Sequence, residues 1–252
     1  MTMHTAITVL LVLADLGTLV WLLARYLFWL PGRDRRWPRI LMLHRVAPEP
    51  GSGMNMPPPR FEALLRLLRD SGYHFVTMSE LLANPEQPRL LALTFDDGFA
   101  DNYQHAFPLL RRYGAKATIY LATEIEGIER LTPAQIQEMA ASGLVEFGAH
   151  TLHHVNLTTL DAAAAEQEIR ESRSQVEALA GSCATFAYPF GRFAPEHEAM
   201  VRAAGYSAAV STRKTIEPLR ADNRYRLPRI STSGDMDLLQ VRIALAKGRF
   251  RL

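Results

Sequence analysis

The sequence predicts an α/β protein in which helices cover a mainly parallel sheet that closes into a barrel, with one transmembrane helix in front of it. Three observations support this fold class. From residue 39 onward, short apolar runs alternate with amphipathic stretches, which is the βαβα order of parallel sheets. Polar residues follow several of the apolar runs, as they do at the catalytic end of a parallel barrel. The first thirty residues are mostly apolar.

Residues 1–30 are predicted to form an uncleaved anchor in contact with membrane lipid. Between residues 6 and 24 the single charge is Asp15, and the apolar stretch continues to Leu30, long enough to cross a bilayer as a helix. Aromatic residues of the kind found at membrane interfaces gather toward its end: Trp21, Tyr26 and Trp29. A signal peptide fits less well, because no Lys or Arg precedes the run and no A-x-A site follows it. A buried helix is a further alternative.

The charges that flank this helix set its expected orientation. No Lys or Arg precedes it, whereas five arginines follow: Arg25, Arg33, Arg35, Arg36 and Arg39. The positive-inside rule then places the main domain on the cytoplasmic side of the inner membrane, although so short an N-terminus biases the count, and a periplasmic or extracellular domain is the alternative. Residues 31–38 form a basic, proline-bounded linker, and a domain over residues 39–252 follows.

The elements of this domain follow from the apolar pattern. Continuous apolar runs predict buried parallel strands at 39–46, 89–95, 115–123, 144–150, 184–191 and 206–212. Helical spacing of apolar residues predicts helices at 61–73, 103–114, 132–143, 161–181 and 195–205. The C-terminal segment 238–252 is predicted to be a final barrel-packing helix. Alternatively, its basic residues could rest on anionic lipid: Arg242, Lys247, Arg249 and Arg251.

Composition excludes two classes of partner or site. A net charge of +2 gives little attraction for nucleic acid. The single cysteine, Cys183, excludes an internal disulfide and a cysteine-rich zinc site. Composition predicts nothing about the oligomeric state.

Polar residues recur at the ends of four predicted strands. His44 ends the first apolar run, Asp96 and Asp97 end the second, His150 ends a later one, and the Tyr-Pro-Phe-Gly stretch 188–191 ends another. Because the carboxyl ends of the strands of a parallel barrel share one face, we expect these residues to meet in one site.

Two histidines and a carboxylate in this set suggest a metal site. His150 and His154 are four residues apart in His-Thr-Leu-His-His, a spacing that puts both on one side of a helical turn. With Asp97 as the candidate carboxylate, they suit a zinc-like divalent ion with an open position, although harder divalent ions accept the same ligands. His153 is expected to point elsewhere. The alternative is a surface loop whose histidines cap turns.

Three motifs, Thr-Phe-Asp-Asp-Gly, His-Thr-Leu-His-His and Tyr-Pro-Phe-Gly, occur here in an order and spacing that resemble the polysaccharide deacetylases. These proteins have a NodB homology domain and form carbohydrate esterase family 4. The resemblance covers roughly His44 to Arg229. It implies a distorted (β/α) barrel, a metal-dependent hydrolase, and N-acetylated sugars as substrates. The ligand types make zinc the first expectation for the divalent metal cofactor. It also implies that Asp96 is the catalytic base and that the metal ligands are Asp97, His150 and His154.

The sequence departs from the family pattern at two points. Ala187 stands where the family has an arginine that braces the base, and Arg229 is a candidate substitute. The late Leu-x-x-His motif that supplies the general acid is absent from the C-terminus. The chain resembles the poly-N-acetylglucosamine deacetylase-like subgroup, in which this histidine is permuted to the first strand, so His44 is the expected general acid. A satisfied core histidine is the alternative for His44.

The expected reaction is hydrolysis of the N-acetyl group of an amino sugar, with release of acetate. Asp96 would accept a proton from water, His44 would protonate the leaving amine, and the N–H of Phe190 would stabilise the oxyanion. Tyr188 and Arg229 are further candidates on the oxyanion and substrate side. The substrate is a polysaccharide or a polyprenyl-linked sugar, and the arginine count favours the second.

Two other functions are possible on the same sequence. One is a membrane-anchored glycan-binding protein without catalysis, supported by Ala187 alone. The other is a metal hydrolase for phosphoesters or peptides, for which no basic cluster in the sequence lines the predicted site.

Overall fold

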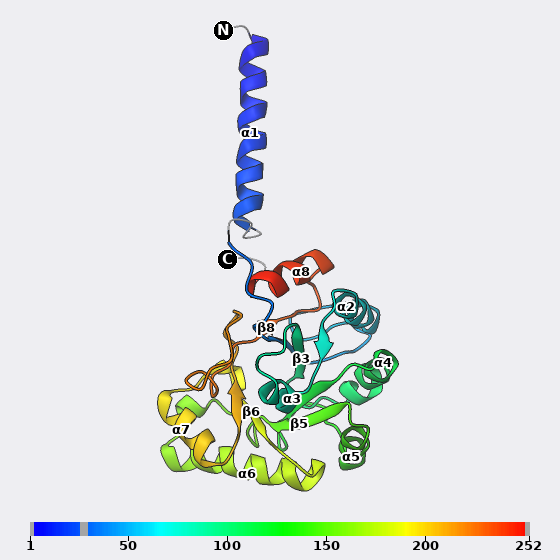
Figure 1. Ribbon diagram of the computed structural model, residues 1–252, viewed down its shortest axis with the longest axis vertical. Helices are drawn as coiled ribbons and strands as arrows, with labels where there is room; N and C mark the ends of the chain where they lie inside the picture. Colours follow the sequence, from blue (N-terminus) through cyan, green and yellow to red (C-terminus); the bar gives the residue numbers. More distant parts are fainter. Residues whose placement is uncertain (1–2, 26–29, 250–252) are drawn as a thin grey trace.

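The computed structural model describes residues 3–25 and 30–249. Helix α1 (Met3–Arg25) is uninterrupted over 23 residues and extends away from the body of the protein (Figure 1). None of its residues is buried, and it is long and apolar enough to cross a membrane, which fits an anchor and a signal sequence alike. Tyr26 and Trp29, two of the expected interfacial aromatics, lie outside the described residues.

The body is built on a parallel sheet of eight strands in the described chain. They are β1 (Arg39–Leu43), β2 (His74–Phe75), β3 (Leu90–Phe95), β4 (Ala117–Leu121), β5 (Val145–Ala149), β6 (Thr185–Ala187), β7 (Ala208–Val210) and β8 (Ile230–Ser231). The strand order is β7-β6-β5-β4-β3-β1-β8, with β2 also paired to β3. Every residue of β1, β3 and β4 is buried, so these strands are apolar on both faces and read as continuous runs in the sequence.

The sheet closes into a distorted barrel through the segment 227–231. Leu227 forms a parallel bridge with Val210 of β7, and three residues later β8 pairs with β1. One short segment therefore joins the two edges of the sheet, and Arg229 lies in the middle of it. The predicted distorted (β/α) barrel is confirmed, with this irregular closure as its distortion.

Helices cover the sheet in the predicted order, except that the short helix at 78–83 was not predicted. They are α2 (Pro58–Asp70), α3 (Met78–Ala83), α4 (Phe107–Tyr113), α5 (Pro133–Ala141), α6 (Ala162–Ala180), α7 (Pro195–Ala203) and α8 (Leu238–Lys247). A π-helical turn, η1 (Asn102–Ala106), leads into α4, and two short 3₁₀ turns are η2 (Leu157–Thr159) and η3 (Pro189–Gly191). Helix α6 illustrates why the boundaries fall where they do: the Asp161 side chain caps its start, and Gly181 in the left-handed conformation ends it.

The last helix packs on the body and on the linker that follows α1. One side of α8 is buried through Val241, Ile243, Ala244 and Leu245, which confirms the prediction of a final barrel-packing helix. The linker lies along it: the Arg33 N–H donates to the carbonyl of Ala246 (2.7 Å), and Lys247 Nζ donates to the carbonyl of Leu30 (2.7 Å). Figure 1 shows α8 at the end of the body from which α1 leaves.

Candidate active site and metal centre

The predicted site residues meet at the carboxyl ends of the central strands. His44 directly follows β1, Asp96 and Asp97 follow β3, and His150 follows β5. Neighbouring parallel strands hold these positions in register, because β3 pairs with both β1 and β4, and β4 pairs with β5. The expectation that separate stretches of the chain converge on one face of the barrel is confirmed.

The turn after β3 sends the two adjacent carboxylates to different partners. The Asp96 N–H still donates to the carbonyl of Leu43 (3.0 Å), so Asp96 continues the pairing of β3 with β1. Asp97 (φ 73°) and Gly98 (φ 78°) then both adopt the left-handed conformation, which reverses the chain. A Cβ at Gly98 would lie 2.6 Å from Leu121 Cδ2, so any side chain there would have to displace the buried side chain of Leu121.

Asp97 and two histidines form the candidate metal centre. Asp97 Oδ1 lies 3.6 Å from His150 Nε2 and 3.4 Å from His154 Nε2, and one ligand atom from each residue lies within 4.8 Å of the others. Asp97 Oδ1 is buried, and no hydrogen-bond partner for it occurs among the described residues. A buried carboxylate oxygen without a donor, facing two imidazole nitrogens, fits a divalent ion of the zinc type.

Hydrogen bonding and burial prepare both imidazoles to act as ligands. His150 Nδ1 lies 2.7 Å from the carbonyl of Ala187. Because a carbonyl only accepts, Nδ1 carries the proton and the Nε2 lone pair faces Asp97. Burial lowers the pKa of His150 to about 3 and also lowers that of His154, so both rings are neutral at pH 7. Burial, together with the charge of Asp96, raises the pKa of Asp97 to about 7.

The two histidine ligands come together through a loop and not through a helical turn, which corrects the expectation from their spacing. Thr151 (φ 62°) and His154 (φ 55°) both adopt the left-handed conformation, and no helix is assigned over 150–154. Glu168 of α6 ties this loop down: its Oε2 accepts the N–H groups of Leu152 (2.9 Å) and His153 (3.2 Å). Nothing in the local spacing reveals this contact.

His153 points away from the site, as predicted. Its Nδ1 lies 2.7 Å from Glu168 Oε1, and its Nε2 lies 3.1 Å from Glu124 Oε2. Its side chain is about half exposed, and the hydrogen bond to Glu168 raises its pKa.

Asp96 is held by Arg229, from the segment that closes the barrel. The guanidinium contacts the carboxylate through two bonds, Nη1 to Oδ1 (2.6 Å) and Nη2 to Oδ2 (2.8 Å). Arg229 also donates to the carbonyl of Ser211 and to Thr94 Oγ1, so its position is fixed. Burial alone would raise the pKa of Asp96, but the positive charge of Arg229 is the largest opposing cause, and this pKa lies well below its usual range.

His44 lies beside this carboxylate on the solvent side. Its Nε2 is 4.0 Å from Asp96 Oδ2, and its side chain is 17% exposed. Burial lowers its pKa, although Asp96 opposes the shift, so His44 is mostly neutral at pH 7. Asn102 Nδ2 donates to the carbonyl of His44 (2.8 Å), and Asp101 accepts the N–H of Val46 (3.0 Å).

Asn102 and Asp101 position the segment that carries His44, and the sequence did not predict this role. Both belong to the same stretch as Asp96 and Asp97, Leu93–Asn102. The sequence feature that could have pointed to them is the polar pair Asp101-Asn102, which follows the pair Asp96-Asp97 by five residues in a segment that is otherwise mostly buried.

Two of the candidate substrate residues require correction. The Tyr188 side chain is fully buried, and its hydroxyl donates to the carbonyl of Tyr225 (2.9 Å), so it does not reach a substrate. Arg229 is 1% exposed and acts on Asp96, so it is a positioning residue and not a direct substrate contact. Phe190 does lie at the mouth: it is 57% exposed, and its ring centroid is 4.5 Å from that of His154.

A comparison with known protein families agrees with this site. The family model described as polysaccharide deacetylase matches residues 83–209, which include both carboxylates and both candidate histidine ligands. The chain belongs to the polysaccharide deacetylase family.

Other members of the polysaccharide deacetylase family are similar over most of this chain. YxkH of Bacillus subtilis, whose name describes it as a polysaccharide deacetylase, is 32% identical over 204 residues, covering 78% of this chain and 72% of YxkH. The poly-beta-1,6-N-acetyl-D-glucosamine N-deacetylase of Staphylococcus aureus is 26% identical over 196 residues, covering 70% of this chain and 67% of that protein. The Streptococcus pyogenes deacetylase PplD, solved in complex with acetate, superposes with a TM-score of 0.72 at 27% identity, covering 80% of this chain and 94% of PplD.

Proposed function

We propose that this polysaccharide deacetylase is a metal-dependent enzyme that hydrolyses the N-acetyl group of an amino sugar in a glycan. One observation carries the proposal: the adjacent carboxylates Asp96 and Asp97 have separate environments, one paired with Arg229 and the other facing two imidazole nitrogens. The names of the relatives from S. aureus and S. pyogenes, an N-deacetylase and a deacetylase bound to acetate, support the same reaction.

The residues divide the chemistry between base, acid and ligand. Asp97, His150 and His154 would hold a divalent ion, for which zinc is the first candidate because the ligands are two nitrogens and one oxygen. When bound, such an ion supplies a Lewis acid that polarises the acetamide carbonyl and lowers the pKa of the attacking water. Asp96 accepts the proton of that water, and its ion pair with Arg229 keeps it ionised and oriented.

His44 completes the reaction at the leaving nitrogen. As the C–N bond breaks, the amine needs a proton, and His44 Nε2 is the group that delivers it. Because His44 is mostly neutral and lies 4.0 Å from Asp96 Oδ2, it receives the proton that Asp96 took from water and passes it on. Delivery of this one proton gives the free amine and acetic acid. The amine then takes up the proton that the acetic acid releases, so the products at neutral pH are acetate and a protonated amine. The backbone N–H of Phe190, at the exposed mouth, is the candidate donor to the oxyanion.

The position of the anchor favours a polysaccharide over a lipid-linked sugar as substrate. The chain enters the body at the amino end of β1, where the linker packs on α8. The site residues follow the carboxyl ends of the strands, and a strand of six residues such as β3 spans roughly 20 Å. The active site therefore lies at the opposite end of β1 from the segment that leads to α1, a position suited to a glycan chain in solution.

The test is acetate release by the full-length protein, solubilised in detergent and loaded with metal. A short N-acetylglucosamine oligomer and a polyprenyl-phosphate-linked N-acetylhexosamine would be assayed side by side. We expect release from the oligomer, lost in Asp96→Asn and retained in Asp70→Asn, an exposed carboxylate of α2. Release from the lipid-linked sugar alone would contradict the orientation argument.

A second readout separates an inactive glycan-binding protein from an enzyme. If metal binds tightly, the oligomer binds, and no acetate appears with either substrate, the catalytic proposal fails. Ala187, the one feature that supported such a protein, loses its weight because Arg229 makes the contact to Asp96 that Ala187 cannot.

A further inference from the structure

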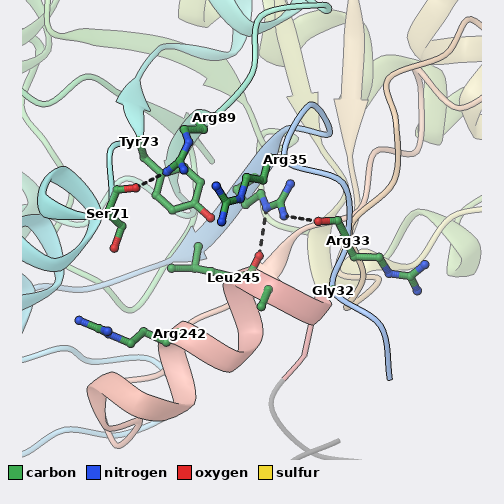
Figure 2. A pocket seen from close by; sticks show the side chains of 10 residues that line it. Gly32, Arg33, Arg35, Ser71, Tyr73, Arg89, Arg242 and Leu245 are labelled. Carbon is green, nitrogen blue, oxygen red and sulfur yellow. Dashed lines mark hydrogen bonds between the residues drawn. The ribbon is translucent and has the colours of Figure 1, made fainter. Parts of the chain in front are cut away.

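A hollow lined by arginines lies at the opposite end of the barrel from the active site. Figure 2 shows this hollow, which has a volume of about 340 Å³ and lies between the linker, the segments before β2 and β3, and α8. Five arginines line it, and no Asp or Glu is among its lining residues: Arg33, Arg35, Arg39, Arg89 and Arg242. We call it the arginine pocket.

One of these arginines is part of the fold and forms the floor of the arginine pocket. Arg39 is 2% exposed, and its guanidinium donates to the carbonyls of Leu245 (3.0 Å), Asp34 (2.6 Å) and Arg33 (3.2 Å). Carbonyl oxygens satisfy its donors without neutralising its charge. The carboxylate of Asp34, which is not among the lining residues, attracts Arg39, but it is one negative charge near five arginines. The hollow therefore keeps a net positive charge that an anion can offset.

The other arginines leave cationic groups available at the rim. Arg35 and Arg242 are exposed, and neither guanidinium has a hydrogen bond or ion pair to another described residue. Arg89 donates to the carbonyl of Ser71, which leaves part of its fork free. Figure 2 shows Arg35, Arg89 and Arg242 around the hollow, whereas the Arg33 side chain is directed away from it.

Backbone hydrogen bonds hold Arg89 in an unfavourable backbone conformation at the rim. Arg89 adopts the left-handed conformation (φ 61°), which is uncommon for a residue with a side chain. Its N–H donates to the carbonyl of Arg35 (2.9 Å), and its own carbonyl accepts the N–H of His74 (2.9 Å). Arg35, Arg89 and Arg242 at the rim therefore lie near one another and above Arg39, with no Asp or Glu among the lining residues. Such an arrangement is typical of an anion site.

The chemistry of the arginine pocket fits a phosphate group. A guanidinium presents two parallel N–H donors that match two phosphate oxygens, and several such forks around one hollow select a tetrahedral dianion or diester over a chloride ion. The Tyr73 hydroxyl adds a neutral donor among the lining residues. We propose that the arginine pocket binds the phosphate of an anionic membrane-lipid headgroup.

The short connection to α1 makes a lipid the source of that phosphate. Helix α1 ends at Arg25, and the carbonyl of Leu30 is bonded to Lys247 of α8. Five residue steps span at most about 18 Å, so α8 stays close to the end of a helix long enough to cross a bilayer. Helix α8 also exposes Leu238 (42%) and Leu239 (57%), apolar side chains that a membrane interface would cover.

The test measures lipid binding by the full-length protein in detergent. The probes are short-chain phosphatidylglycerol, phosphatidylcholine with the same acyl chains, and inorganic phosphate. We expect a clear preference for phosphatidylglycerol. Removing one juxtamembrane arginine weakens such binding about fivefold, so Arg35→Gln with Arg242→Gln should weaken it roughly twenty-five-fold. Arg170→Gln, which removes an exposed arginine of α6, is the matched control.

Each outcome decides the proposal. Loss of the phosphatidylglycerol preference in the double variant, with the control unchanged, supports it. An unchanged preference for phosphatidylglycerol in the double variant overturns the proposal. Displacement of the lipid by inorganic phosphate at equal concentration also overturns it, because the arginine pocket would then be a site for a free ion. Acetate release from a soluble oligomer should be equal in all three proteins, so this test succeeds or fails independently of the proposed deacetylation.

Discussion

Replacing Arg229 by methionine should destabilise the protein far more than the same change at another ion-paired arginine. Arg229 is 1% exposed and makes two charge-assisted bonds to Asp96, which is itself 3% exposed. Methionine keeps much of the volume and removes the charge. Asp96 would then be a buried carboxylate beside the carboxylate of Asp97, with its main counter-charge removed.

The magnitude follows from the burial of the pair. Removing one partner of a buried ion pair costs about 3–5 kcal/mol, because the other charge remains desolvated. For a domain of this size, each kcal/mol lowers the melting temperature by about 2–4 °C, so Arg229→Met should lower it by roughly 6–20 °C. Arg226→Met is the matched control: Arg226 lies three residues earlier, is 39% exposed and pairs with Glu198 at 3.2 Å. An exposed pair of this kind contributes about 0–1 kcal/mol.

The pH dependence of this loss identifies Asp96 as its cause. In the native protein, the pKa of Asp96 lies below its unfolded value, so its stabilising contribution is present above that value and is lost only as the pH falls through the folded pKa. Without Arg229, burial raises the pKa of Asp96 above its unfolded value. The difference in unfolding free energy between variant and native protein should then be largest at neutral pH and shrink as Asp96 becomes protonated.

Urea unfolding in detergent, with a chelator present to exclude metal effects, measures the loss of unfolding free energy and its pH dependence. A thermal melt under the same conditions measures the change in melting temperature. Equal midpoints for Arg229→Met and Arg226→Met would refute the reasoning. A loss of stability for Arg229→Met that does not change with pH would show that lost packing, and not the unpaired charge of Asp96, causes the loss.

Three further predictions concern the site. Because the pKa of Asp97 is raised to about 7, zinc affinity of the metal-free protein should fall about tenfold per pH unit below pH 7, and a flat calorimetric titration series would contradict this. Gly98→Ala should lower the free energy of unfolding in urea by at least about 1 kcal/mol more than Gly114→Ala. Both glycines are left-handed, but only at Gly98 does a Cβ contact a side chain, so equal losses for the two variants would exclude a steric cause. Asn102→Ala should slow acetate release about tenfold to a hundredfold without changing metal content, because the bond to the carbonyl of His44 is lost, and coupled loss of metal would point to general unfolding.

The sequence predicted the central strands well, because strands buried on both faces appear as continuous apolar runs. Every residue of β3 and β4 is buried, and both lie within their predicted ranges. Strands β2 and β8 were not predicted, because two residues carry no readable period. The barrel closure at 227–231 contains Pro228, a residue that argues against a strand, and the segment is recognisable only from its contacts with β7 and β1.

The candidate site shows the same division between local and tertiary information. The order of the motifs predicted that Asp97, His150 and His154 lie close together. The loop that places the two histidines contains left-handed residues, which no spacing rule predicts. Arg229 was a candidate for the missing arginine, yet it lies 133 residues from Asp96, and only the closure of the barrel brings them into contact. Tyr188 entered the set through its motif, but motif membership did not reveal that its side chain packs into the core.

The arginines after α1 bear on which side of the membrane the domain lies. Counting them predicts a cytoplasmic domain, on the premise that these charges exist to set topology. In the structure, Arg39 is committed to carbonyl groups of the linker and α8, and Arg33 lies over the ring of Trp37 (6.0 Å). If Arg35 binds a lipid phosphate, it too has a role apart from topology, and anionic phospholipids occur on both faces of a membrane. These contacts form only after the chain has folded, so all five arginines still count toward a cytoplasmic domain. The position of the active site at the far end of β1 from the anchor, which suits a polysaccharide, is the argument for the outer face.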